Sequence, residues 1–361
     1  MDREMNVFVL YSRTLDVGAW EEQYRKGLAP DCTPYGYHHA EAHGCRMSYS
    51  RPTRPRGVLK LIDKVLRRVL RFDLLHVWNN RRNLFDPQID VIWTHTEEEH
   101  LGIGVLRALF RKPSSPVIAQ SVWLMDRWKS FGVLRRMLFR QLLSRMEVLT
   151  FLSTLNADAA RRRFPNKRIE HVRFGISAES FPITKPRPRL DSERQIRVLS
   201  IGHDVHRDWA TLCEALGGRS GVTIRALSRN FPRDLIADNI SVEYLDQNGI
   251  RSAYAWADCV VVPLTDNLHA SGITVALEAI ALGVPLVITR VGGLEAYLDG
   301  EGVCFVEIGD AAGLRAAVLN LSQHDYVARA AKAQQHFERT DATTAHYARQ
   351  HVALSRELSR A

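Results

Sequence analysis

The stretch from Asp258 to Gly293 carries the residues whose types and spacing best suit chemistry. An apolar run, Cys259 to Pro263, ends in a polar loop, and Ser271-Gly272-Ile273-Thr274 closes that loop where a helix begins. The first N–H groups of a helix have no partner within it, and a glycine lets an anion approach them. A diphosphate suits such a site. The alternative is an ordinary turn in which Ser271 or Thr274 caps the helix, and the residue types leave the two interpretations even.

Glu278 lies one turn into the same predicted helix. Its carboxylate can accept hydrogen bonds from neutral hydroxyl groups, such as those of a ribose. Together with the loop before it, this residue predicts a site for a nucleoside diphosphate.

Apolar strand patterns alternate with helical patterns along the chain, which predicts parallel sheets covered on both faces. We expect an α/β fold with two doubly wound domains and ligands at the carboxyl ends of the strands. The predicted strands are 6–11, 90–94, 116–121, 147–152, 196–201, 222–227, 241–245, 259–263 and 285–289. The predicted helices are 98–109, 156–164, 208–216, 274–282, 311–321 and 341–358.

The length of 361 residues fits two domains, at roughly 100–200 residues per domain. Residues 181–189 contain three prolines, which break regular structure and indicate a linker. We therefore expect an N-terminal domain over residues 1–182, a second domain over 190–340, and a separate helical segment over 341–361.

The segment Leu277-Glu278-Ala279-Ile280-Ala281-Leu282-Gly283-Val284-Pro285 resembles the nucleotide-sugar-binding segment of glycosyltransferase family 4, the glycosyl transferases group 1. The resemblance implies that Glu278 holds the ribose of the donor nucleotide. The family has a first Glu eight positions earlier, where this chain has Ala270. The chain therefore departs from the family in its contacts to the donor sugar.

A second segment, from Val198 to Ala215, resembles the family's Gly-Arg-x-x-x-x-Lys-Gly motif, with a loop one residue shorter. Arg207 takes the place of the Lys and His203 that of the Arg, two residues that neutralise the donor pyrophosphate. Arg207 can bind phosphate through two hydrogen bonds, whereas His203 is a weaker cation unless its pKa is raised. The alternatives are an exposed arginine at a loop and a histidine without this role.

The resemblance implies a GT-B fold, in which two Rossmann-like domains face a central cleft and the 341–361 helix returns to the first domain. It also implies transfer from a UDP- or GDP-type nucleotide sugar with retention, with Arg207 and Glu278 catalytic. No D-x-D motif is present, so we expect neither a metal nor another cofactor. Arg229 could contact the nucleotide, and Gly292-Gly293-Leu294-Glu295 resembles a turn of the family. The predicted donor-binding residues are Gly202, His203, Arg207, Arg229, Ser271, Gly272, Ile273, Thr274 and Glu278.

The N-terminal half offers fewer motifs. The loop after the first predicted strand contains only Gly18 where the family has two glycines, and the family's His falls near Val122. Trp123 and Asp126, close to that position, are our candidates for the acceptor side together with Gly18. His95 and His100 are five residues apart, which does not fit a zinc-binding pair, and residues 94–100 favour a helix start with an acidic first turn over a cleft lining.

Charge divides the chain unevenly. Residues 1–190 carry 33 Lys and Arg against 19 Asp and Glu, and residues 191–361 carry 16 against 21. Two stretches of the basic half, 57–72 and 133–146, combine basic residues with an apolar stripe at helical spacing, which favours contact with an anionic membrane surface over a merely solvated face. Nucleic acid is the competing partner, but no nucleic-acid-binding motif is present.

We expect a cytoplasmic protein, peripheral on the inner face of the cell membrane, because no signal peptide or membrane-spanning run is evident. The five cysteines predict free thiols. The expected acceptor is a lipid-linked or envelope glycan. Two rival functions stay open: a nucleotide-sugar 2-epimerase, and a non-catalytic protein that binds nucleotide sugar as the partner of another transferase.

Overall fold

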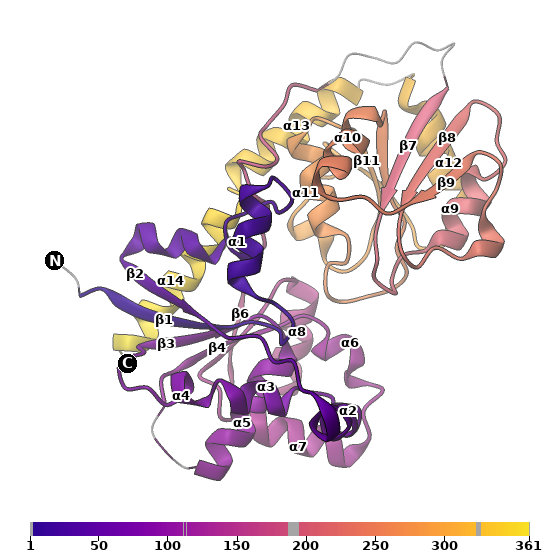
Figure 1. The fold of residues 1–361 in the computed structure, drawn as a ribbon. Helices are drawn as coiled ribbons and strands as arrows, with labels where there is room; N and C mark the ends of the chain where they lie inside the picture. Colours follow the sequence, from indigo (N-terminus) through magenta and orange to yellow (C-terminus); the bar gives the residue numbers. More distant parts are fainter. Residues whose placement is uncertain (1–2, 111, 113, 187–194, 323–325, 361) are drawn as a thin grey trace. The chain divides into compact units, whose positions relative to one another are not determined.

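A computed structural model describes residues 3–110, 112, 114–186, 195–322 and 326–360 (Figure 1). The chain divides into two compact units. Unit 1 comprises Met1–Gln23, Cys32–Arg173 and Thr344–Ala361, and unit 2 comprises Tyr24–Asp31 and Phe174–Thr343. Each unit contains one six-stranded sheet whose strand pairs are all parallel. The predicted fold class, α/β with two doubly wound domains, is confirmed.

The sheet of unit 1 has the strand order β2-β1-β3-β4-β5-β6, with helices packed on its faces (Figure 1). The chain goes from β1 to β2 on one side and returns to β3 on the other, so the order reverses between β1 and β3. Its elements are β1 (Met5–Leu10), α1 (Val17–Arg25), η1 (Pro34–His43), β2 (Cys45–Tyr49), α2 (Gly57–Leu70), α3 (Leu74–Asn79), α4 (Arg81–Leu84), β3 (Val91–Thr94), α5 (Glu97–Phe110), β4 (Val117–Ser121), α6 (Leu124–Trp128), α7 (Val133–Leu143), β5 (Val148–Phe151), α8 (Thr154–Arg163), β6 (Arg168–His171) and α14 (Thr344–Arg360).

The sheet of unit 2 has the order β12-β11-β10-β7-β8-β9. This is the 3-2-1-4-5-6 order of dinucleotide-binding folds, and ligands of such sheets bind where the order reverses, here between β7 and β10. Its elements are β7 (Ile196–Ile201), α9 (Trp209–Leu216), β8 (Val222–Leu227), η2 (Arg233–Leu235), β9 (Ile240–Glu243), α10 (Gln247–Trp256), β10 (Cys259–Val262), α11 (Ile273–Ala281), β11 (Leu286–Thr289), η3 (Leu294–Ala296), β12 (Cys304–Val306), α12 (Ala311–Leu319), η4 (Asn320–Ser322) and α13 (Tyr326–Arg339).

Buried apolar strands explain both sheets. All four residues of β10 and of β11 are buried, as expected for central strands covered on both faces. Helix α14 lies in unit 1, where the indole of Trp93 in β3 donates to Ser355 Oγ at 2.9 Å and Tyr37 pairs with Tyr347 at 3.0 Å.

The division between the units falls at residues 173/174 rather than at 182. Ile176 and Phe181 belong to the apolar core of unit 2. The described part of the proline-containing segment also packs there, because the Thr184 N–H donates to the Ala281 carbonyl at 2.8 Å. Residues 187–189 of the predicted linker lie outside the described residues.

Several elements were not predicted. Residues 17–25 form helix α1 instead of a loop, and β2, β6 and β12 are short strands at or near the edges of the sheets. Edge strands are half exposed, so they lack the continuous apolar run that marked the central ones. Among the described residues, no helix is long and apolar enough to cross a membrane.

Candidate functional site

The switch point of unit 2 is built from two loops that are bound to each other. One loop follows β7 and begins at Gly202, and the other follows β10 and ends at Gly272. The Asp208 N–H donates to the Pro263 carbonyl at 3.0 Å, and the Thr265 N–H donates to the His206 carbonyl at 2.9 Å. The sequence segments that predicted a phosphate site therefore meet at one edge of the sheet.

Arg207 lies beneath these loops, with its side chain only 3% exposed. Its Nε donates to the Ile201 carbonyl and its Nη1 to Ser271 Oγ, both at 2.9 Å. A Cβ on Gly202 would lie 1.8 Å from this Nε, and one on Gly272 would lie 3.4 Å from Nη1. Gly202 therefore makes room for the side chain of Arg207, and Gly272 lies beside its guanidinium.

Asp204 is the third member of this cluster and was not predicted. Its Oδ2 accepts a hydrogen bond from Ser271 Oγ at 2.7 Å and lies 3.4 Å from Arg207 Nη1, while Oδ1 accepts from the His206 N–H at 2.8 Å. Burial raises the pKa of this carboxyl, but the Arg207 charge and these hydrogen bonds outweigh burial and hold the pKa below its usual value. A carboxylate with this role depends on the folded loops, so no sequence signal marked it.

Neither Ser271 nor Thr274 caps the N-terminus of α11. The N-cap residue is Gly272, with φ +81°, and no side chain makes a capping hydrogen bond there. The Ser271 hydroxyl bonds to Arg207 and Asp204 instead. Ile273 is buried and Thr274 is exposed. An N-terminus without a side-chain cap next to a buried arginine is an arrangement that binds anions.

Glu278 lies one turn further along α11 and is partly buried. Its Oε2 accepts a hydrogen bond from the Tyr254 hydroxyl of α10 at 2.7 Å. Burial raises the pKa of Glu278 to about 7, although the hydrogen bond from Tyr254 opposes the shift. Tyr254 was not predicted, because its contact with Glu278 joins two helices that are separated in the sequence.

His203 and Arg229 form the outer part of the site. The Arg229 N–H donates to His203 Nδ1 at 3.2 Å, and the Arg229 guanidinium lies 3.8 Å from the ring centre of Tyr244. Burial and the charges of Arg229 and Arg207 lower the pKa of His203. The lowered pKa disfavours the charged form of His203, which occupies the position where the family has an arginine.

The three acceptor-side candidates lie in unit 1 but do not share one structural role. Gly18 is an exposed residue of α1 whose backbone is outside the left-handed region, so that position does not require glycine. Trp123 is the N-cap of α6, and its N–H donates to Glu97 Oε2 at 3.3 Å. Asp126 lies in the first turn of α6 and is partly buried.

Buried ionisable groups gather beyond β3 in unit 1. The acidic residues 97–99 form the first turn of α5, as the sequence favoured. Burial raises the pKa of Glu99 to about 8, and burial lowers the pKa of His95 and of His100 to about 3. His95 stacks on Tyr35 with 3.3 Å between ring centres, and Nδ1 of His100 lies 3.2 Å from Thr94 Oγ1. These contacts describe a packed interior.

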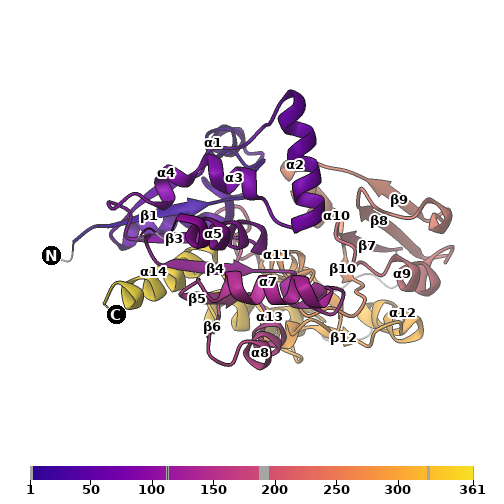
Figure 2. The same cartoon turned by 90° about the horizontal axis from the view of Figure 1, so that it is seen from below.

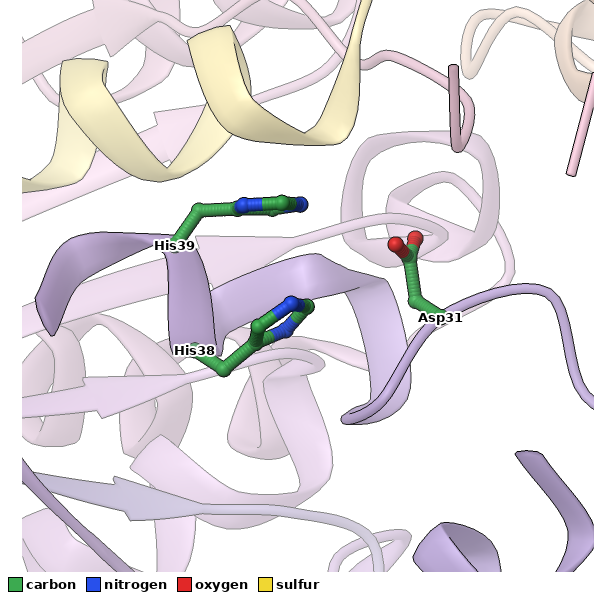
Figure 3. Close-up of side chains that lie close together, drawn as sticks. All are labelled: Asp31, His38 and His39. Carbon is green, nitrogen blue, oxygen red and sulfur yellow. The ribbon is translucent and has the colours of Figure 1, made fainter. Parts of the chain in front are cut away.

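A pair of imidazoles on η1 is the feature of unit 1 that most resembles a metal site. Figure 3 shows His38 and His39 side by side, with ring centres 4.1 Å apart. His38 Nδ1 is 3.1 Å from Thr33 Oγ1. Asp31, also drawn in Figure 3, lies in the 24–31 segment of unit 2. Protein zinc sites use three or four ligands from the chain, so the pair alone does not make one.

The family match of this chain lies in unit 2. Residues 217–324 match the family described as glycosyl transferases group 1. Glycogen synthase of Mycobacterium tuberculosis is 30% identical over 160 residues, which cover 41% of this chain and 38% of that protein. The chain thus spans about two fifths of the length of the curated relatives that it matches.

Solved structures match the whole chain in fold. Sucrose-phosphate synthase from Thermosynechococcus elongatus has a TM-score of 0.71 at 15% identity, over 98% of this chain and 99% of that one. The Anabaena HepE protein in complex with UDP and glucose has a TM-score of 0.64 at 16% identity, over 97% and 99%. These matches are to proteins with two α/β domains of the GT-B type, which agrees with the predicted fold.

Proposed function

We propose that the chain, of which residues 217–324 match the glycosyl transferases group 1, transfers a sugar from a nucleotide-sugar donor to a glycan acceptor. The donor binds at the switch point of unit 2. The observation that carries the proposal is the buried Arg207, which bonds to Ser271 directly before the uncapped N-terminus of α11.

The chemistry asks the protein to stabilise a departing diphosphate. The bond from C1 of the sugar to the diphosphate oxygen breaks and the acceptor hydroxyl oxygen bonds to C1. The hydroxyl proton is released together with the nucleoside diphosphate. Negative charge grows on the diphosphate, where Arg207 and the N–H groups of α11 stabilise it electrostatically. Glu278 accepts hydrogen bonds from the ribose and thereby fixes the nucleotide. We expect retention of configuration and no requirement for a metal, as the family resemblance implies.

The acceptor that we propose is a lipid-linked glycan reached from an anionic membrane surface, and helix α2 supports this choice. Figure 2 shows the course of α2 in unit 1. Asp63 is the one buried residue of this helix, whereas most of its apolar residues are exposed. Asp63 pairs with Arg13 at 2.6 Å and with Arg67 at 3.2 Å. The exposed apolar residues of α2 are Val58, Leu59, Leu61, Ile62, Val65 and Val69.

Helix α7 extends the same surface. Nη2 of Arg135 donates to the Val69 carbonyl at 3.1 Å, which joins α7 to the end of α2. Leu134 is 83% exposed, and Val133, Met137 and Leu138 are exposed beside it. An exposed apolar stripe flanked by Lys60, Lys64 and Arg68 fits the boundary between lipid headgroups and acyl chains. Each nearby basic residue adds about 1 kcal/mol at an anionic leaflet.

The donor is tested by nucleoside diphosphate release from UDP-, GDP-, ADP- and dTDP-sugars, with and without vesicles that carry extracted glycolipids. We expect release from one donor, stimulation by the vesicles, and loss of release in Arg207→Ala. Nucleotide binding without release would favour the non-catalytic partner, and conversion of the UDP-sugar to its 2-epimer without acceptor would favour the epimerase. Absence of nucleotide binding would refute a donor site in unit 2.

The membrane surface is tested by co-sedimentation with vesicles of phosphatidylglycerol or of phosphatidylcholine alone. Lys60→Glu combined with Lys64→Glu should weaken binding to the anionic vesicles at least tenfold, since each basic residue contributes about 1 kcal/mol. The matched control is Arg162→Glu with Arg163→Glu on α8, which makes the same charge change on exposed residues of unit 1. Equal losses in both variants would mean that total charge, and not this surface, governs binding.

A further inference from the structure

The donor site of unit 2 already holds a negatively charged group. The Asp204 carboxylate accepts the Ser271 hydroxyl at 2.7 Å and faces Arg207 Nη1 at 3.4 Å. Both partners lie at the N-terminus of α11, where the proposed function puts the donor diphosphate. A carboxylate oxygen thus makes the hydrogen bonds that a phosphate oxygen would make there.

Arg207 has little freedom to serve two anions in different places. Its side chain is buried, and its Nε is fixed on the Ile201 carbonyl. The side chain of Arg207 fills the space next to Gly202, so the guanidinium cannot take another position without breaking these contacts. Asp204 is different, because a third of its side chain is exposed and its loop includes Val205, which is 86% exposed. Of the two charged partners, the carboxylate is the one that can move.

We infer that Asp204 is an internal competitor of the donor diphosphate: its carboxylate holds Arg207 and Ser271 until the nucleotide sugar displaces it. The inference rests on the proposed function, since it needs the diphosphate to bind at Arg207. The displaced carboxylate keeps its hydrogen bond from the His206 N–H by staying in its own turn. The effect is a donor site with lowered affinity for every nucleoside diphosphate, and for free pyrophosphate as well.

The test is calorimetric binding of UDP, GDP, pyrophosphate and the matching nucleosides to the whole chain. Asp204→Asn keeps the shape of the side chain and removes its charge. We expect this variant to bind the diphosphates about tenfold more tightly, because a like charge beside the phosphate is removed. Affinity for the nucleoside should not change. Asp234→Asn is the matched control, because it removes one exposed carboxylate elsewhere in unit 2.

The other outcomes are decisive in different ways. Weaker diphosphate binding by Asp204→Asn, in Mg²⁺ or in EDTA, would make Asp204 a positioning residue for Arg207 or a cation ligand, and would overturn the inference. Unchanged binding would overturn it as well, provided that Arg207→Ala still weakens binding. If Arg207→Ala leaves binding unchanged, or no diphosphate binds to any variant, the proposed function fails first and the inference fails with it.

Discussion

Arg207 follows β7 in unit 2, and Arg13 follows β1 in unit 1; each strand borders the switch point of its own sheet. Arg13 lies 2.6 Å from Asp63 and 3.3 Å from Asp73, and both carboxylates are at most 3% exposed. Arg207 faces one carboxylate, Asp204, which is 33% exposed. The same residue type at comparable places therefore has two different surroundings: Arg13 neutralises two buried carboxylates, and Arg207 has one half-buried partner, which in our proposal a ligand displaces.

The rest of each switch point follows the same division. In unit 1, the aromatic rings of Tyr11, Tyr35 and Tyr37 and the imidazole of His95 pack against one another beyond β1 and β3. In unit 2, glycines border the guanidinium and a helix N-terminus opens beside it. In open parallel sheets, ligands generally bind at the switch point. The side chains around each switch point decide whether it has room for a ligand or is occupied by packed residues.

Replacing the two arginines should give opposite results, and this is the largest expected effect. Arg13→Ala leaves two buried carboxylates short of their main partner, so we expect unit 1 to lose about 3 kcal/mol of unfolding free energy. Arg207→Ala should cost much less stability, because Asp204 can reach water, while it removes donor turnover. Urea denaturation of both variants, monitored by tryptophan fluorescence, measures the first effect.

Arg3→Ala is the control for the first comparison. Arg3 forms an exposed ion pair with Asp90 in the same unit, and exposed pairs contribute about 0–1 kcal/mol. If Arg13→Ala had the wild-type free energy of unfolding but no longer turned over the donor, the proposed difference between the two arginines would be wrong. Arg13 would then be part of the reaction.

The glycine that seats Arg207 gives the second effect. In Gly202→Ala the new methyl group would lie 1.8 Å from Nε of Arg207, so the guanidinium has to leave its position. We expect turnover of the donor to fall by roughly 100-fold, the scale of losing one electrostatic donor to a transition state. Gly300→Ala is the matched control, because nothing lies within 4 Å of its added Cβ. Equal donor turnover in Gly202→Ala and Gly300→Ala would show that turnover does not depend on the position of the Arg207 guanidinium.

The candidate site of unit 2 could be proposed from sequence because phosphate recognition in general uses a few residue types within short stretches. Gly202, Arg207, Ser271 and Gly272 lie close together in the structure. Asp204 and Tyr254 were missed because their roles depend on partners 67 and 24 residues away along the chain. Nothing local distinguishes such a residue from an ordinary surface carboxylate or a core tyrosine.

Helix α2 shows why unit 1 was harder to predict. Its amphipathic pattern was visible, and an apolar stripe at helical spacing normally marks the buried face. In the structure the stripe is exposed and Asp63 is buried. Arg13, which pairs with the buried Asp63, lies 50 residues before it in the chain, so periodicity gives the stripe but not the side of the helix that is buried.

The pH dependence of donor binding gives the third, intermediate effect. Burial raises the pKa of Glu278 to about 7, so the ionised form that accepts ribose hydroxyls dominates only above that pH. The donor KM of the wild type should therefore rise as the pH falls from 8 to 6. In Glu278→Gln, a neutral amide accepts more weakly, and we expect KM to be about tenfold higher at pH 8, since charge-assisted hydrogen bonds are stronger than neutral ones.

At pH 6 the difference between wild type and Glu278→Gln should shrink, since the wild-type carboxyl is then largely protonated. Initial rates at each pH, measured in one set of buffers without Mg²⁺, give both KM values. Arg233→Ala, which changes an exposed arginine of the same unit and keeps Glu278, is the comparison variant. A constant ratio of the two KM values from pH 6 to pH 8 would contradict a ribose contact through ionised Glu278.

The smallest effect concerns the rim of the donor site. Arg229→Ala removes a guanidinium 3.8 Å from the Tyr244 ring centre and a charge that helps to lower the pKa of His203. We expect affinity for UDP or GDP to fall by two- to fivefold, or about 0.5–1 kcal/mol, which is the scale of one exposed charge pair. The pKa of His203 should move upward, toward the ordinary value of about 6.5, because burial remains but one repelling charge is gone. Titration of the His203 ring by NMR measures this shift.

Arg233→Ala, which changes an exposed arginine of the same unit, is the control and should not change the pKa of His203. If Arg229→Ala does not change this pKa either, the charge of Arg229 does not act on His203, and the two residues do not form one electrostatic site.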